Sequence, residues 1–152
     1  MSLWSEVKDN FIDDGSLRDI YFYPSDILTW QKFLDSISSS SFESIYYRDH
    51  EITEFTWNAE NALKQRQKAS PLLQLSKDRI TFNCHFFTED EIEIDISPKE
   101  IKGEKEFNIV LEFMEYFGSI LGTQVVLTEE NSKDLIILSK KENEAVRNNK
   151  NI

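Results

Sequence analysis

The sequence holds one thiol and two imidazoles, and the thiol stands next to one of the imidazoles, at Cys84 and His85. A nucleophilic thiolate needs a base within hydrogen-bonding distance. These two residues belong to a run that alternates apolar and polar residues, which predicts a β-strand, and neighbours on a strand point to opposite faces of a sheet. Cys84 falls on an apolar position, so we expect a small buried core residue and no catalytic dyad.

His85 takes a polar position of this run, and a second alternating run places Glu91, Glu93 and Asp95 nearby. One imidazole and two carboxylates on one face could bind a divalent metal ion. No second histidine has ligand spacing, because His50 stands in a separate predicted turn. A cross-strand pair between His85 and Glu93 is the simpler interpretation. A metal-dependent hydrolase that uses His85, Glu93 and Asp95 is therefore kept as an alternative function.

Alternate carboxylates could also supply a general acid and a general base, as in glycosidases, but such pairs need a cleft and unequal surroundings. On a strand they more simply form the solvated face. The sequence has no glycine-rich phosphate loop, no Gly-x-Ser-x-Gly motif and no zinc spacing, and only 4 glycines. We therefore expect no catalytic residue, no bound metal and no cofactor, and a protein that is not an enzyme.

The two alternating runs lie within residues 79–97 and predict an antiparallel hairpin. We centre its turn on Glu89, because a shift by one residue would put apolar side chains and acids on the same face. One face then carries the pairs Phe86–Ile92, Cys84–Ile94 and Phe82–Ile96. The other face carries Thr81, Asn83, His85 and Phe87 opposite Ser97, Asp95, Glu93 and Glu91.

The remaining elements follow from periodicity. Helices are expected over 3–12, 25–38 and 104–121, and further strands over 17–23, 42–49, 52–57, 123–128 and 135–139. Helix 104–121 is apolar over more than half of its circumference, so we expect it to be central and covered on more than one side. Gly122 is its predicted left-handed cap. The one basic patch, within 58–69, is expected to be a solvated helix or loop.

These elements predict a single α+β domain over residues 1–139. Its mainly antiparallel sheet should form one layer, and helices 25–38 and 104–121 should cover the apolar face as the second layer. Residues 140–152 are charged and rich in asparagine, so we expect a frayed tail. The wide apolar surface of helix 104–121 also leaves room for a cavity, and a small-molecule binding module is a further alternative.

Composition narrows the function. The 152 residues are 39% apolar, with 11 Phe, 5 Tyr and 3 Trp, which is enough for one real core. Acids outnumber bases by 28 to 17, and the net charge is −11. Such a surface repels phosphate backbones and anionic lipids, so we expect no nucleic-acid or membrane partner. One cysteine allows no internal disulfide, and no segment is typical of a membrane span or signal peptide; we expect a cytoplasmic protein.

A family resemblance rests on three groups of residues. They are Gly15-Ser16-Leu17-Arg18-Asp19-Ile20 with Trp30 in the next helix, Asn83-Cys84-His85-Phe86-Phe87 followed by Glu91-Ile92-Glu93, and Leu121-Gly122 before Val125-Val126-Leu127-Thr128-Glu129-Glu130-Asn131. Together they resemble small, acidic, stand-alone bacterial proteins that act as immunity partners of polymorphic or contact-delivered toxins. The resemblance implies a role as an inhibitor and leaves the cognate toxin open.

We therefore expect a non-enzymatic binding protein of the immunity or antitoxin type, which neutralises a basic toxin domain, most simply one that acts on nucleic acid. Residues 89–95 contain five acids, which on a hairpin would form a ridge at the turn. Acidic inhibitors of nucleases gain fast association and cover phosphate-binding sites. The ridge could instead only keep a sheet face soluble. The candidate partner-binding residues are His85, Phe87, Glu89, Asp90, Glu91, Glu93 and Asp95.

Overall fold

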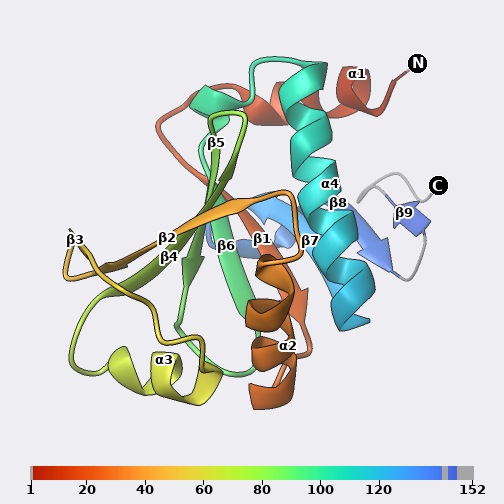
Figure 1. The fold of residues 1–152 in the computed structure, drawn as a ribbon. Helices are drawn as coiled ribbons and strands as arrows, with labels where there is room; N and C mark the ends of the chain where they lie inside the picture. The colour runs from red at the N-terminus through yellow and green to blue at the C-terminus, as the bar shows by residue number, and fades with distance from the viewer. Residues whose placement is uncertain (1, 142–143, 147–152) are drawn as a thin grey trace.

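A computed structural model describes residues 2–141 and 144–146 (Figure 1). In these residues nine strands form one antiparallel sheet in the order β3-β2-β4-β5-β6-β1-β7-β8-β9. The strands are β1 Arg18–Tyr23, β2 Glu43–Arg48, β3 Glu51–Ile52, β4 Pro71–Lys77, β5 Ile80–His85, β6 Ile92–Ile96, β7 Gln124–Glu129, β8 Ser132–Lys141 and β9 Glu144–Val146. The helices are α1 Leu3–Val7, α2 Ile27–Ile37, α3 Ala59–Gln65 and α4 Glu104–Leu121, with 3₁₀ turns η1 Lys8–Phe11 and η2 Pro98–Glu100. The predicted α+β class is confirmed.

The β5–β6 hairpin has the predicted register. Cys84 lies opposite Ile94, and Asn83 and His85 lie opposite Asp95 and Glu93. The pairing therefore centres on Glu89. Cys84 is fully buried, as expected for a core residue. Because side chains alternate along each strand, this register sends the apolar residues of the hairpin to one face and the acids to the other.

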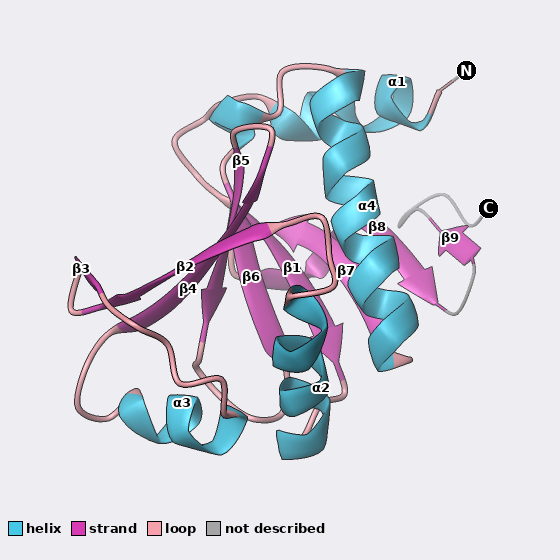
Figure 2. Cartoon of the chain, in the orientation of Figure 1, coloured by secondary structure: helices cyan, strands magenta, loops and turns pink. Residues whose placement is uncertain are grey.

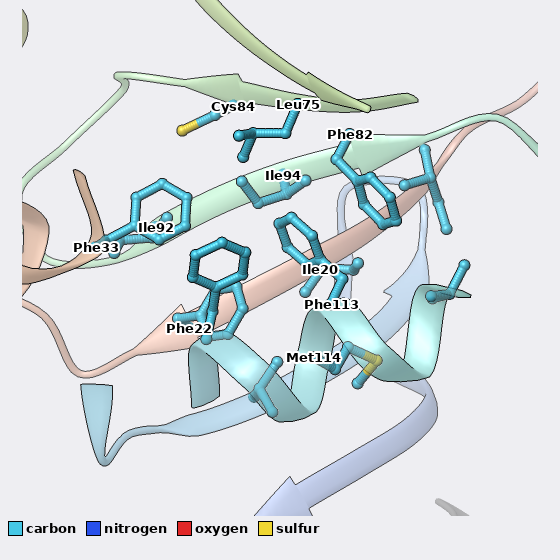
Figure 3. Close-up of a cluster of buried hydrophobic side chains, with 14 of the residues drawn as sticks. Ile20, Phe22, Phe33, Leu75, Phe82, Cys84, Ile92, Ile94, Phe113 and Met114 are labelled. Atoms are coloured by element: carbon cyan, nitrogen blue, oxygen red, sulfur yellow. The ribbon is translucent and has the colours of Figure 1, made fainter. Parts of the chain in front are cut away.

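The core fills the space between the apolar face of the sheet and helices α2 and α4, which the ribbon places on that side (Figures 2 and 3). Phe82 of β5 stacks on Phe113 of α4, with ring centroids 4.1 Å apart and an interplanar angle of 2°. Phe33 of α2 meets Phe117 of α4 edge to face. Helix α4 thus packs on both the sheet and α2, as its wide apolar surface predicts. Gly122 ends α4 with a φ of 65°, the left-handed cap that glycine favours.

The sheet differs from the sequence-based expectation at its β3 edge. Asp49 and His50 form a tight two-residue turn with φ values of 51° and 70°, and the strand that follows it, β3, contains only Glu51–Ile52. The chain then leaves the edge of the sheet, and the ring of Phe55 packs on Tyr46 with centroids 4.4 Å apart. The prediction of a strand over 52–57 is therefore wrong beyond Ile52.

Strand β4 was not among the predicted elements. It lies between β2 and β5 and buries Leu73 and Leu75. Its sequence begins with proline and contains two adjacent leucines, which hides the alternation. At the other edge, β8 extends to Lys141 and pairs with β9, so the described part of the predicted frayed tail belongs to the sheet. Residues 142–143 and 147–152 of that tail lie outside the described residues.

Phe113→Ala should lower the free energy of unfolding by about 3–5 kcal/mol, because it removes a fully buried ring and leaves a cavity against Phe82. Chemical denaturation would measure the change. Leu28→Ala is the matched control, since Leu28 on α2 is 77% exposed and its truncation should change stability by less than about 0.5 kcal/mol. Equal effects of the two substitutions would contradict this account of the core.

Candidate functional site

The sheet face opposite the helices holds the candidate site. Strand order brings four strands together there, β5, β6, β1 and β7. Register then aligns residues of these strands, most of them polar, in two rows across the sheet. One row consists of His85, Glu93, Tyr21 and Val126. The next consists of Asn83, Asp95, Asp19 and Thr128. We call the acids of this region, Asp19, Glu91, Glu93 and Asp95, the open-face cluster.

Asp95 is held by two donors from β5. The side-chain amide of Asn83 donates a hydrogen bond of 2.9 Å to Oδ1, and Nε2 of His85 lies 2.5 Å from Oδ2. The imidazole therefore contacts the diagonal neighbour Asp95, and the predicted direct pair with Glu93 does not form. Burial by itself would lower the pKa of His85, but the hydrogen bond and the charge of Asp95 outweigh it and raise this pKa.

Glu93 lies between the strand neighbours His85 and Tyr21 and is half-buried. Burial raises the pKa of Glu93 to about 7, with further repulsion from the charges of Asp19 and Glu91. Glu93 is therefore close to half-protonated at neutral pH. A positive charge brought to this face would lower that pKa and favour the carboxylate.

Asp19 of β1 lies directly opposite Asp95 and is only 2% exposed. Its Oδ2 accepts a 2.7 Å hydrogen bond from the backbone N–H of Asn131 and a 3.2 Å hydrogen bond from the hydroxyl of Tyr21. Burial raises the pKa of Asp19 despite these donors. Like charges directly opposite each other on two strands are unfavourable. Here each carboxylate is stabilised by its own pair of donors.

Strand β8 adds a positive charge to the edge of the cluster. Lys133 forms an ion pair with Glu91. Its ammonium nitrogen also lies 5.1 Å and 5.4 Å from the ring centroids of Tyr21 and Tyr23, within the range of a cation–π interaction. Tyr21 is buried beneath it, and burial raises the pKa of its hydroxyl.

The structure divides the predicted acidic ridge between two places. Glu91, Glu93 and Asp95 lie on the open face. Glu89 and Asp90 line a separate hollow of about 650 Å³, together with Lys64 and other residues of α3. The turn that carries them is fixed to α2, because the indole N–H of Trp30 donates a 3.0 Å hydrogen bond to the carbonyl oxygen of Thr88. The basic patch of α3 thus faces the acids of the turn and not those of the open face.

Phe87 remains an exposed aromatic group beside the cluster. Its ring stacks on that of His85, with centroids 4.9 Å apart and an interplanar angle of 4°, and 58% of the residue is exposed. The two predicted anchors, His85 and Phe87, therefore form one stacked aromatic pair next to the acids.

Sequence reasoning found His85, Glu91, Glu93 and Asp95 but missed Asp19, Tyr21 and Lys133. Asp19 and Tyr21 share one parity of a strand that was predicted correctly. Only the position of β1 beside β6 brings them to the site, and the sequence does not specify this position.

The described residues include no preformed set of metal ligands on this face. Within residues 2–141 and 144–146, no group of three or more His, Cys, Asp or Glu side chains is arranged to hold a metal ion. Five surface hollows of 350–650 Å³ in the described part of the chain are lined by residues other than His85, Glu93 and Asp95. Burial raises the pKa of the Cys84 thiol well above its ordinary value, so the reactive thiolate is disfavoured. The arrangement can bind cations and hydrogen-bond donors, and it can take up protons near neutral pH.

Comparison of the chain with protein-family models, with curated proteins and with solved structures gave no match. Among the described residues, no helix is both long enough and apolar enough to span a membrane.

The free energy of unfolding of the wild type should fall by about 1–2 kcal/mol as the pH rises through the range in which Glu93 ionises, and Glu93→Gln should abolish this fall. The figure is reduced to allow for solvent screening. The pKa of Glu93 is about 7 in the folded state against an ordinary value of 4.5. Between these values the folded protein keeps a proton that the unfolded chain has released. Stability is therefore fully present below the lower value and declines as the pH rises toward the upper one. Urea unfolding across this window, in wild type and variant, measures the difference.

Glu89→Gln is the matched control, because Glu89 is an exposed acid of the same hairpin. It should leave the pH profile unchanged. The same decline in wild type and Glu93→Gln would show that Glu93 does not hold the proton.

Proposed function

We propose that this chain is a non-enzymatic binding protein of the immunity or antitoxin type, which acts in the cytoplasm by covering the basic surface of a toxin domain. One observation carries the proposal. The sheet face opposite the helices gathers four carboxylates, with their mutual repulsion only partly compensated, beside the exposed ring of Phe87. The net charge of −11 supports it, since long-range attraction would speed the encounter with a basic partner.

The contacts indicate what such a partner must offer. Glu93 lies among three other acids, and the stacked rings of His85 and Phe87 lie beside it. An arginine fits both features, because its guanidinium can pair with carboxylates and stack on an aromatic ring. A toxin domain that binds nucleic acid presents such arginines at its phosphate-binding site. Binding there would place acids where the phosphates of the substrate would lie.

The proposal is tested with the product of the gene immediately upstream of the coding sequence. Expressed alone, this product should stop growth, and co-expression of the present chain should restore it. The two purified proteins should form a complex whose association slows as salt is added, because screening weakens attraction between exposed charges. Failure both to protect and to bind would overturn the proposal.

Phe87→Ala should weaken that complex by about 1–2 kcal/mol, as expected for an exposed aromatic anchor. Leu28→Ala serves as the control, because it removes an apolar side chain that is even more exposed than Phe87 from α2, on the other face of the sheet. Calorimetric titration gives both affinities. A larger loss for Leu28→Ala would place the interface on the helical face.

Binding should also release protons near pH 7. A cationic partner lowers the pKa of Glu93 from about 7, so bound protein holds fewer protons than free protein. By linkage, affinity should rise from about pH 6 to about pH 8. Calorimetry in two buffers with different ionisation enthalpies measures the released protons. Glu93→Gln should reduce their number and Glu89→Gln should not; equal proton release in both variants would assign it to another group.

A further inference from the structure

The outer edge of β2 is only half covered by β3. Backbone pairing between the two strands includes Arg48 and Tyr47, and the N–H of Thr53 then donates a 3.0 Å hydrogen bond to the carbonyl oxygen of Tyr46. In an antiparallel ladder both backbone groups of a residue point to the same side, and this side alternates along the strand. The next residue of β2 that faces outward is therefore Ser44.

The chain has left this edge before it reaches the position opposite Ser44. Phe55 would be the partner of Ser44 if β3 continued, but its ring packs on Tyr46 and Phe86 at centroid distances of 4.4 Å and 6.0 Å. Within the described part of the chain, the pairing of β2 with β3 ends at Tyr46 and Thr53. The N–H and C=O of Ser44 thus point outward from the sheet at an edge that β3 does not cover.

Two hollows meet at this edge. One, of about 560 Å³, lies between α2 and the start of β2, with Leu34, Ile37 and Phe42 in its lining. The other, of about 350 Å³, lies beside Ile45 on the adjoining part of β2. Ser44 and Trp57 border both hollows. Three apolar side chains around them are well exposed: Ile45 at 41%, Ile52 at 70% and Trp57 at 44%.

The charges around the two hollows have one sign. Asp35 and Glu43 line the first and Glu54 lines the second, and the lining of both contains no lysine or arginine. A second copy of this chain would bring the same acids against one another. A segment that carries lysine or arginine beside apolar residues would complement both the charges and the apolar lining.

We propose that the β2 edge at Ser44 binds an extended, basic segment of a partner protein, which adds to the sheet as a further strand. Its backbone pairs with the N–H and C=O of Ser44. Apolar side chains on one side of the segment fill the hollow between α2 and Trp57, and basic side chains on its other side meet Glu43 and Glu54. Strand addition of this kind takes affinity from the main chain and specificity from alternate side chains. The surface is separate from the open-face cluster and does not depend on the function proposed for it.

The test uses a short synthetic peptide of alternating valine and lysine and the full chain. Tryptophan fluorescence should change on binding, because Trp57 borders both hollows. Ser44→Pro should weaken binding at least tenfold, since it removes the outward N–H. The β2–β4 ladder should persist, because that ladder uses the residues on either side of Ser44. The thermal unfolding midpoint of Ser44→Pro checks that the fold is kept.

Two matched probes complete the experiment. The same peptide with alternate amides methylated cannot pair as a strand, and it should not bind. The peptide with glutamate in place of lysine should bind at least tenfold more weakly. Equal binding of all three peptides, or no binding of the first, would overturn the proposal. Concentration-dependent dimerisation that Ser44→Pro abolishes would also overturn it, because the occupant would then be a second copy.

Discussion

The alternation of β5 and β6 is the constraint on which the rest of the structure depends. Ile92, Ile94 and Cys84 must share a face, and the acids between the isoleucines are then forced to the other face. A shift by one residue would bury carboxylates beneath α4, at a cost far above the few kcal/mol by which a domain of this size is stable. The position of the helices and the character of the open face both follow from this one register.

The carboxylates of the open-face cluster repel one another, and the hydrogen bonds that they accept reduce this repulsion. Asp19 and Asp95 stand opposite each other, and each accepts two hydrogen bonds from groups fixed by the sheet or the β7–β8 turn. Glu93 sits between these two carboxylates and Glu91, and burial, together with the repulsion that remains, raises its pKa. The stability of the free protein and its binding to a cationic partner therefore favour opposite protonation states of Glu93. A free protein gains from protonating Glu93, and a complex with a cation gains from ionising it.

The sequence predicted those parts of the molecule that depend on local pattern. The register around Glu89, the two large helices and the Gly122 cap all follow from residues close in the chain, where periodicity is strong. The turn predicted at Asp49-His50-Glu51 lies where the structure has its two-residue turn, but the strand expected after it, over 52–57, ends early because the ring of Phe55 packs on Tyr46, and no local pattern signals this departure. Strand β4 was missed because its adjacent leucines, Leu72 and Leu73, obscure the alternation.

The candidate site could be predicted only in part, for a reason of topology. Every acid on the β5–β6 hairpin was identified, since both strands are consecutive in the chain. Asp19 and Lys133 come from strands and turns that are distant in sequence, and strand order decides their neighbours. The split of the acidic ridge has the same origin. Glu89 lines the same hollow as Lys64 because the turn packs toward α3, and this packing depends on the three-dimensional path of residues 58–70.

Because Asp19 accepts a hydrogen bond from the backbone of Asn131, the positions of the open face differ in how readily they tolerate substitution during evolution. Asp19 fixes the turn that follows β7, so a substitution there would disturb the scaffold as well as the surface. Glu91, Glu93 and Phe87 fix no backbone in this way, and single substitutions can alter them while the core stays intact. A lineage could thus redirect this face toward a new partner through a few outward-facing positions. The frame that holds those positions would be inherited unchanged.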